Sequence, residues 1–222
     1  MSGDSVQVRL AVVTGGHAFD VPNFHRLFRR LAGIDAYVQP MDDFASSSQE
    51  TRDAYDGIVF YHMLPGTPLD TGQPGYSGKP LQALKRLTET GQGLVVMHHA
   101  LLAYEKWSAW RELSGINPVL RGYHHDQSIK VRVINREHPI TAGLVDFGVI
   151  DETYEIDEPD EGNEILLATD HPQSVKALAW TRRFGRSNVF SIALGHDDQG
   201  WRNPQFEEVL RRGILWSVAK GI

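Results

Sequence analysis

Five histidines of this chain stand at the ends of apolar segments. The segments are LAVVTGG, GIVFY, GLVVM and VFSIALG, and the residues that follow them are His17, His62, the adjacent pair His98 and His99, and His196. Imidazole is the side chain that most readily takes up and releases a proton near neutral pH. If these segments are neighbouring parallel strands, their carboxyl ends meet at the edge where open α/β sheets bind ligands. The pattern therefore predicts a site for acid and base catalysis.

A single histidine at a strand end can serve a local hydrogen bond to a loop carbonyl. His62 lies deepest in its apolar run, and we expect it to be structural. Four segments that end in the same way are harder to explain by local bonding. Within the adjacent pair, His98 is expected to face the crevice and His99 to anchor the turn, because neighbours on a strand end point to opposite sides.

Acidic partners for these imidazoles are expected from the segment DETYEIDEPDEG. Most of this run reads as a solvated loop, but Asp151, Glu152 and Tyr154 follow the apolar stretch FGVI and are expected to point inward. A carboxylate beside an imidazole fixes its tautomer and raises its basicity, as a general base requires. His125, in the loop-like stretch RGYHHDQ, and Asp197, next to a catalytic histidine, complete the polar set.

Two tryptophans near these residues suggest a sugar ligand. Trp107 follows the double histidine, and Trp201 follows the stretch GHDDQG. Flat aromatic faces beside polar groups stack on sugar rings, although core packing is the alternative for either ring.

Histidines with one or two carboxylates also suit a divalent metal ion such as Zn²⁺. The sequence contains no compact ligand motif such as HExxH. We therefore assign no metal ligands from the sequence and keep a divalent metal as the only cofactor to be considered.

The elements that must position these residues alternate between strands and helices in the first half of the chain. Apolar β-branched runs alternate with helical periodicity up to about residue 115, which indicates a mainly parallel sheet flanked by helices. Later segments follow one another without helices between them, so the second half is expected to be more antiparallel. The expected strands are 6–16, 35–40, 55–64, 93–99, 128–134, 164–168, 175–181 and 188–194, and the expected helices are 22–33, 80–93 and 203–221.

Composition narrows the class of protein. The 222 residues suit one domain, 1–222, and the formal net charge of -6 argues against a nucleic-acid partner. There is no cysteine, which excludes disulfides and every mechanism with a cysteine nucleophile. The apolar run near the start is too short for a signal peptide or a membrane span. We expect a cytoplasmic protein that binds no membrane.

Four stretches together resemble the trehalose utilisation (ThuA-like) family, over about residues 10 to 216. They are VVTGGHAFDVPNFHRLF, GQGLVVMHHALLAYEKWSAWRELSG, REHPITAGLVDFGVIDETYEI and DHPQSVKALAWTRRFGRSNVFSIALGHDDQGWRNPQFEEVLRRGILW. The resemblance implies the flavodoxin-like fold of the class I glutamine amidotransferases. It places His98 or His99 where those enzymes hold their cysteine nucleophile, and His196 where they hold a catalytic histidine. Without cysteine, glutamine hydrolysis through a thioester is not available.

The resemblance also implies a substrate class, because the family is associated with trehalose and related disaccharides, often beside oxidoreductases that make 3-keto sugars. We expect an enzyme that isomerises or cleaves a keto-glycoside or keto-disaccharide, with a functional link to a sugar oxidoreductase. The catalytic residues are then His196 as principal base or acid, His98 as second proton carrier and Glu152 as their orienting carboxylate. The residues expected to contact the sugar are His17, His99, His125, Asp151, Tyr154, Trp107, Asp197 and Trp201.

Two other functions remain open at this point. One is a metal-dependent sugar hydrolase, and the other is a non-catalytic carbohydrate-binding or regulatory protein that kept the fold without the chemistry. A homodimer is expected only because symmetric dimers are common.

Overall fold

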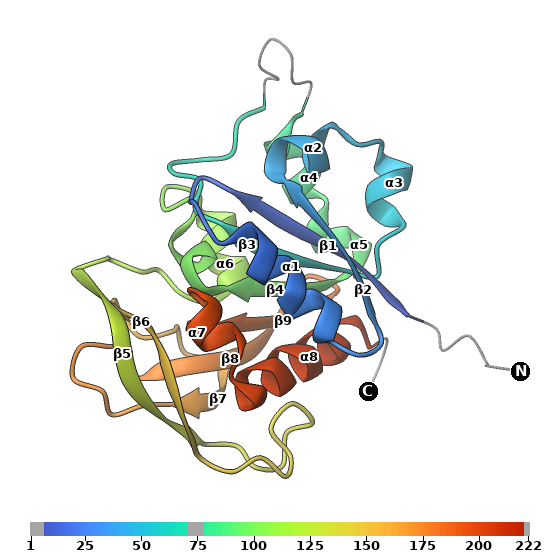
Figure 1. Cartoon of the computed structure of the whole chain (residues 1–222). Helices are drawn as coiled ribbons and strands as arrows, with labels where there is room; N and C mark the ends of the chain where they lie inside the picture. Colours follow the sequence, from blue (N-terminus) through green and yellow to red (C-terminus); the bar gives the residue numbers. More distant parts are fainter. Residues whose placement is uncertain (1–6, 71–77, 220–222) are drawn as a thin grey trace, which may run out of the picture.

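The computed structural model describes residues 7–70 and 78–219, and its centre is a sheet of nine strands (Figure 1). Residues 65–80 are rich in Gly and Pro, which favours a loop, and the part of this stretch from 71 to 77 lies outside the described residues. The strand order is β2-β1-β3-β4-β9-β8-β7-β5-β6. The first five positions of this order form a parallel half, as in flavodoxin-like folds. Its strands are β1 (Val8–Gly15), β2 (Ile34–Pro40), β3 (Gly57–His62), β4 (Gly93–Met97) and β9 (Ser187–Ile192).

The other half of the sheet is antiparallel, and β9 joins the two halves. It pairs in parallel with β4 and antiparallel with β8. Two long strands at the far edge, β5 and β6, pair along most of their length, with an irregular register between His124 and Gln127. The strands of this half are β5 (Gly122–Val133), β6 (Phe147–Glu155), β7 (Glu164–Ala168) and β8 (Ala177–Phe184).

Helices cover both faces of the sheet. Figure 1 shows α1, α7 and α8 in front of it, with α5 and α6 behind. The side chain of Asp20 caps α1, and that of Asn203 caps α8 by accepting from two backbone N–H groups. The helices are α1 (Val21–Arg30), α2 (Met41–Ser46), α3 (Gln49–Asp53), α4 (Pro80–Lys85), α5 (Leu87–Thr90), the 3₁₀ helix η1 (His98–Leu102), α6 (Ser108–Ser114), α7 (Asp198–Trp201) and α8 (Pro204–Val218).

The expected α/β architecture is confirmed, including the change to antiparallel strands after residue 115. One local expectation is wrong, because the helix expected over 80–93 is divided into α4 and α5. The acidic run 151–162 is mostly loop, as expected, but β6 extends into its first part, to Glu155. Buried polar side chains interrupt the alternation that identifies a strand, so the sequence pattern did not reveal β6.

The core lies on both sides of the parallel half. Strands β3 and β4 are buried at every position, which explains why they read as continuous apolar runs. The largest fully buried side chains include Trp110, Trp180 and Trp201. Within 7–70 and 78–219, no helix has the length and apolar character needed to cross a membrane.

Candidate active site

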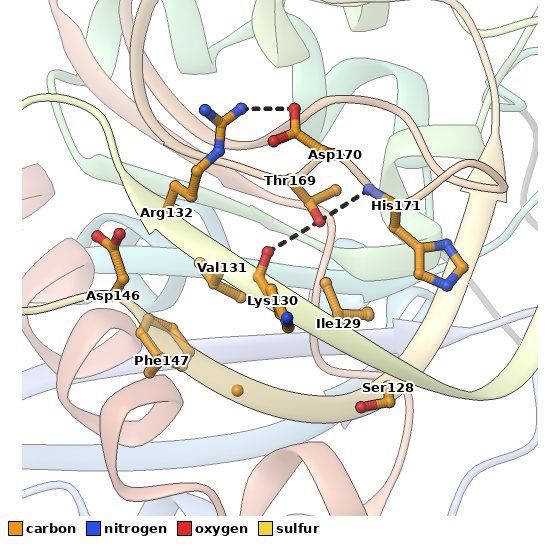
Figure 2. A pocket seen from close by; sticks show the side chains of 11 residues that line it. Ser128, Ile129, Lys130, Val131, Arg132, Asp146, Phe147, Thr169, Asp170 and His171 are labelled. Atoms are coloured by element: carbon orange, nitrogen blue, oxygen red, sulfur yellow. Dashed lines mark hydrogen bonds and ion pairs between the residues drawn. The ribbon is translucent and has the colours of Figure 1, made fainter.

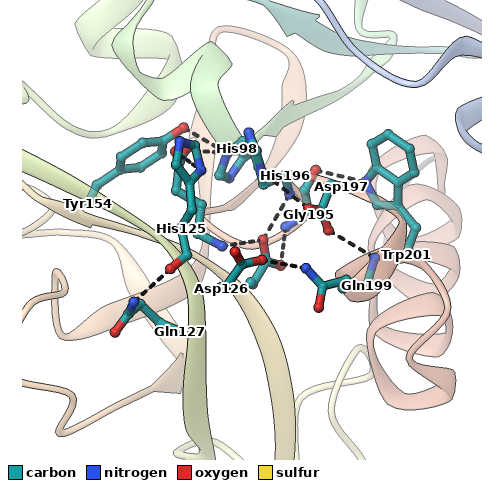
Figure 3. Close-up of polar contacts among 12 residues, drawn as sticks. His98, His125, Asp126, Gln127, Tyr154, Gly195, His196, Asp197, Gln199 and Trp201 are labelled. Atoms are coloured by element: carbon teal, nitrogen blue, oxygen red, sulfur yellow. Dashed lines mark hydrogen bonds and ion pairs between the residues drawn. The ribbon is translucent and has the colours of Figure 1, made fainter.

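Four imidazoles from distant parts of the chain meet at the carboxyl edge of the parallel strands. Figure 3 shows His98, His125 and His196 among them. His98 begins η1 directly after β4, and His196 follows β9. Their ring centroids are 5.3 Å apart, and the ring of His125, from β5, is 5.0 Å from that of His196. His17, after β1, lies 6.1 Å from His196 on another side. The expected meeting of strand-end histidines is therefore seen in the structure.

His98 occupies a strained turn at the end of β4. Its φ is 54°, a left-handed conformation that residues with a side chain rarely adopt. The ring is fully buried, and its two nitrogens have polar neighbours on both sides. Nδ1 lies 2.8 Å from the carbonyl oxygen of Ala193, while Nε2 lies 2.7 Å from the hydroxyl of Tyr154 and 3.1 Å from Oε2 of Glu152. The turn thus aims the ring at β6 and away from solvent.

Glu152 links the buried and exposed imidazoles. One carboxylate oxygen faces Nε2 of His98, and the other lies 3.0 Å from Nδ1 of His125. Burial raises the pKa of Glu152, but its side-chain contacts with His98 and Tyr154 outweigh burial and bring this pKa to about 2. The carboxylate is therefore ionised although only 5% of it is exposed.

Three buried side chains hold the backbone that carries His196. Asp151 accepts from the N–H of Gly195 at 2.7 Å and from that of His196 at 2.9 Å. The indole N–H of Trp201 donates to the carbonyl of Gly195, and the hydroxyl of Tyr61 donates to the carbonyl of His196. The N–H and carbonyl groups of Gly195 and His196 thus all have hydrogen-bond partners outside this dipeptide. These bonds fix the backbone position from which the His196 side chain extends.

This arrangement corrects three expectations about sugar contacts. Asp151 is 2% exposed and faces backbone N–H groups, so its role is to position the His196 loop. Trp201 is fully buried against Phe24 and cannot stack on a sugar. Trp107 stands just before α6 and packs near Tyr104, so its described contacts lie outside the histidine cluster.

The second histidine of the pair lies beneath the site. His99 is 1% exposed, and burial lowers its pKa to about 2, so the ring stays neutral. The exposed ring of His17 stacks on it with centroids 4.4 Å apart. His99 therefore supports His17 and has no exposed surface for a ligand. Burial also lowers the pKa of His62, to about 3, in keeping with its expected structural role.

Two further expected contacts lie at the margin. Asp197 caps α7, and its other oxygen is 3.7 Å from Nδ1 of His196. Tyr154 is 5% exposed, with its hydroxyl turned to His98. Burial and the other groups around His196, first of them His98, lower its pKa, while the carboxylates of Glu152 and Asp197 oppose this shift.

Tyr61 is a site residue that the sequence analysis missed. It precedes His62 at the end of β3, so its position at a strand end was the available signal. An aromatic side chain inside an apolar run reads as core, and its ring is indeed buried. Only the fold shows that its hydroxyl reaches the backbone of His196.

The same cluster offers ligand atoms for a metal ion. Atoms from His98, Glu152 and His196 all lie within 4.8 Å of one another. Two imidazole nitrogens and a carboxylate oxygen are a ligand set that Zn²⁺ accepts. Among the groups that shift the pKa of Glu152 and of His196 most strongly there is no lysine or arginine.

A separate cavity of about 780 Å³ lies between β5, β6 and residues 169–171 (Figure 2). At its wall Arg132 pairs with Asp170, and the hydroxyl of Thr169 donates to the backbone carbonyl of Lys130. None of the histidines of the cluster lines it. We therefore place the chemistry at the histidine cluster and assign no function to this cavity.

Solved structures of similar fold come from several microorganisms. A ThuA-like protein of Parabacteroides merdae is 16% identical with a TM-score of 0.74, covering 97% of this chain and 91% of that one. A ThuA-like protein of Bacteroides uniformis is 18% identical with a TM-score of 0.73, covering 96% and 91%. A cytoplasmic protein of Salmonella typhimurium is 12% identical with a TM-score of 0.66, covering 93% and 98%. No curated protein sequence matches.

The mixed sheet, its flanking helices and these neighbours define an α/β protein with the fold of the class I glutamine amidotransferases. The model of the trehalose utilisation (ThuA) family matches residues 13–217. The chain therefore belongs to the trehalose utilisation family, and the family points to a role related to carbohydrates.

Proposed function

We propose that this protein is an enzyme that acts on a keto-sugar, a glycoside or disaccharide with one hydroxyl oxidised to a ketone. The reaction is the removal and return of a proton next to the carbonyl, leading to isomerisation or to cleavage of the glycosidic bond. Family membership supports a carbohydrate substrate. An oxidoreductase that converts a sugar hydroxyl to a ketone is the class of enzyme that would supply it.

The observation that carries this proposal is the ring of imidazoles around one buried carboxylate. Three of the histidines, His17, His125 and His196, retain exposed surface. Proton abstraction next to a carbonyl needs a base, a second proton carrier and a group that polarises the oxygen. Imidazoles that a substrate can reach supply the first two.

The roles differ in one respect from those expected from the sequence. His98 is fully buried, so it cannot touch a sugar in this structure and acts through Glu152 and Tyr154. His125 shares Glu152 with His98 and has an exposed side chain, which makes it the second proton carrier beside His196. Glu152 keeps its expected role as the carboxylate that orients the imidazoles.

The test is exchange of the proton next to the ketone for deuterium in heavy water, followed by NMR with 3-keto-trehalose. We expect exchange with the wild-type protein and at least about a hundredfold loss in His196→Ala and in His125→Ala. His25→Ala is the control, because His25 is exposed on α1 and no hydrogen bond or ring contact among the described residues joins it to the cluster. Unchanged exchange in both cluster variants would overturn the proposal.

A metal-dependent sugar hydrolase is the second candidate, and the three converging ligand atoms favour it. Such an enzyme would cleave unoxidised trehalose with water. A protein that cleaves trehalose, and shows no exchange with the keto-sugar, is this hydrolase. Sugar-dependent thermal stabilisation without product from either sugar would indicate a binding protein.

A further inference from the structure

The tautomer of His98 follows from its buried contacts. The carbonyl oxygen of Ala193 can only accept a hydrogen bond, and it lies 2.8 Å from Nδ1. Nδ1 therefore carries a hydrogen. In a neutral ring the other nitrogen, Nε2, then presents a lone pair.

That lone pair faces a second electron-rich atom. Oε2 of Glu152 lies 3.1 Å from Nε2, and an ionised carboxylate oxygen also has only lone pairs to offer. The hydroxyl of Tyr154 has one hydrogen, and both Nε2 and Glu152 compete for it. A buried nitrogen and a buried carboxylate oxygen at this distance need a positive charge between or beside them.

We propose that a divalent transition-metal ion of the Zn²⁺ type binds here, through Nε2 of His98, a carboxylate oxygen of Glu152 and a ring nitrogen of His196. These atoms lie within 4.8 Å of one another. Ligands about 2.1 Å from a tetrahedral ion lie about 3.4 Å apart, so the longest separation in the group must shorten by about 1.4 Å at most to complete the site. His196 is the ligand with room to move, because it is only partly buried.

The surroundings of the three ligands match those of a metal site. A metal-bound histidine usually donates its other N–H to a carbonyl or carboxylate, as His98 does to Ala193. The second oxygen of Glu152 is held by His125, and the backbone of His196 is held by Asp151. Two nitrogens and one oxygen suit Zn²⁺ better than Mg²⁺ or Ca²⁺, which prefer oxygen ligands throughout.

Three protein ligands leave one position for a substrate oxygen, as in catalytic zinc sites. This inference deepens the proposed function and rests on it in one respect, that the substrate oxygen is the ketone of a sugar. The ion then supplies the group that polarises the carbonyl. A ring nitrogen of His196 that binds the metal cannot also take up a proton, so the inference changes the role of His196 from proton carrier to ligand. Proton transfer then falls to His125 and to the exposed residue His17.

Metal binding can be measured without any turnover. Protein stripped with chelator is titrated with Zn²⁺ by calorimetry and with Co²⁺ by visible absorption, which reports the ligand geometry. We expect one ion per chain, a rise in Tm with Zn²⁺ and a tetrahedral or five-coordinate Co²⁺ spectrum. His196→Ala and Glu152→Gln should each weaken binding at least about tenfold. His25→Ala and His171→Ala, which alter histidines outside the cluster, should bind as the wild type does.

Absence of binding at millimolar metal, or equal binding by the wild type and both cluster variants, would overturn the inference. If no metal binds, a proton on Nε2 of His98 bridges this nitrogen and Oε2 of Glu152 instead. Should Glu152→Gln fail to fold, the partly exposed His196→Ala carries the test. Stoichiometric metal with no deuterium exchange on the keto-sugar would support the site and remove the proposed function. Deuterium exchange on the keto-sugar by protein that binds no metal would support the proposed function and remove the metal site.

Discussion

The carboxylate of Asp151 accepts a hydrogen bond from the backbone N–H of His196 at 2.9 Å. Asp151 belongs to β6, at one edge of the sheet, while His196 follows β9 in its middle. The same carboxylate accepts from Gly195 and from the N–H of Glu152. One buried acid thus ties the loop that carries the catalytic candidate to the strand that carries its carboxylate partner.

Asp151→Asn should destabilise the protein by about 1–3 kcal/mol, because one of three buried N–H groups then faces an amide N–H₂. The His196 loop should also open more often, which hydrogen exchange at Gly195 and His196 would report. The measurement is urea unfolding with hydrogen exchange. Asp197→Asn is the matched control, since Asn caps a helix as well as Asp does. Equal stability of Asp151→Asn and wild type would show that the carboxylate is not the clamp.

The carboxylate of Asp151 packs against Gly200, where the lack of a side chain leaves room for it. A Cβ atom at this position would lie 2.5 Å from Oδ2 of Asp151. Gly200→Ala should therefore displace the carboxylate or α7 and lower stability by about 1–3 kcal/mol. Gly148→Ala, on β6, is the control, because a Cβ there meets nothing within 4 Å. Thermal unfolding of the two variants side by side tests the prediction, and similar Tm values would contradict it.

Trp201→Phe keeps an aromatic ring in the core but loses the indole N–H that bonds the carbonyl of Gly195 at 2.8 Å. We expect a loss of about 1–3 kcal/mol, since a buried carbonyl group loses its partner. If Trp201 instead acted only by filling space, Trp201→Phe would lose no more stability than the smaller ring volume accounts for, and hydrogen exchange at His196 would stay as in the wild type. Denaturant unfolding together with hydrogen exchange distinguishes the two roles.

Acid should destabilise the protein through His62. Burial lowers the pKa of this histidine from 6.5 to about 3, and neither ring nitrogen has a partner among the described residues. Between these pH values the unfolded chain takes up a proton that the folded protein does not, so stability falls as pH falls through this range. The slope is about 1.4 kcal/mol per pH unit for one proton.

His62→Phe should remove that part of the slope, because phenylalanine does not titrate. Urea unfolding at a series of pH values between 7 and about 4 measures it. His25→Ala is the control, since His25 is exposed. An acid limb with the same slope in His62→Phe and wild type would contradict the prediction.

Much of the fold was predictable because strand and helix periods differ and because buried parallel strands read as apolar runs. The strand β6, which ends at Glu155, was not predicted, because its buried acidic and tyrosine side chains give it the composition of a polar loop. Histidines at strand ends could be counted and grouped from the sequence, which is why His17, His98 and His196 were found together. Glu152 and His125 could be named as members of the site, but which ring each one contacts could not be predicted, because they come from β6 and β5 at the opposite edge of the sheet.

The sequence by itself determined the alternation of elements, the absence of cysteine chemistry and the set of imidazoles at one sheet edge. It did so through local signals: periodicity, composition and position at the end of a run. Only the tertiary structure decided that His98 is buried against Glu152, that His125 shares this carboxylate, and that Asp151 holds the backbone of His196. These relations depend on strand pairing and on the left-handed turn at His98. Neither can be inferred from the spacing of residues along the chain.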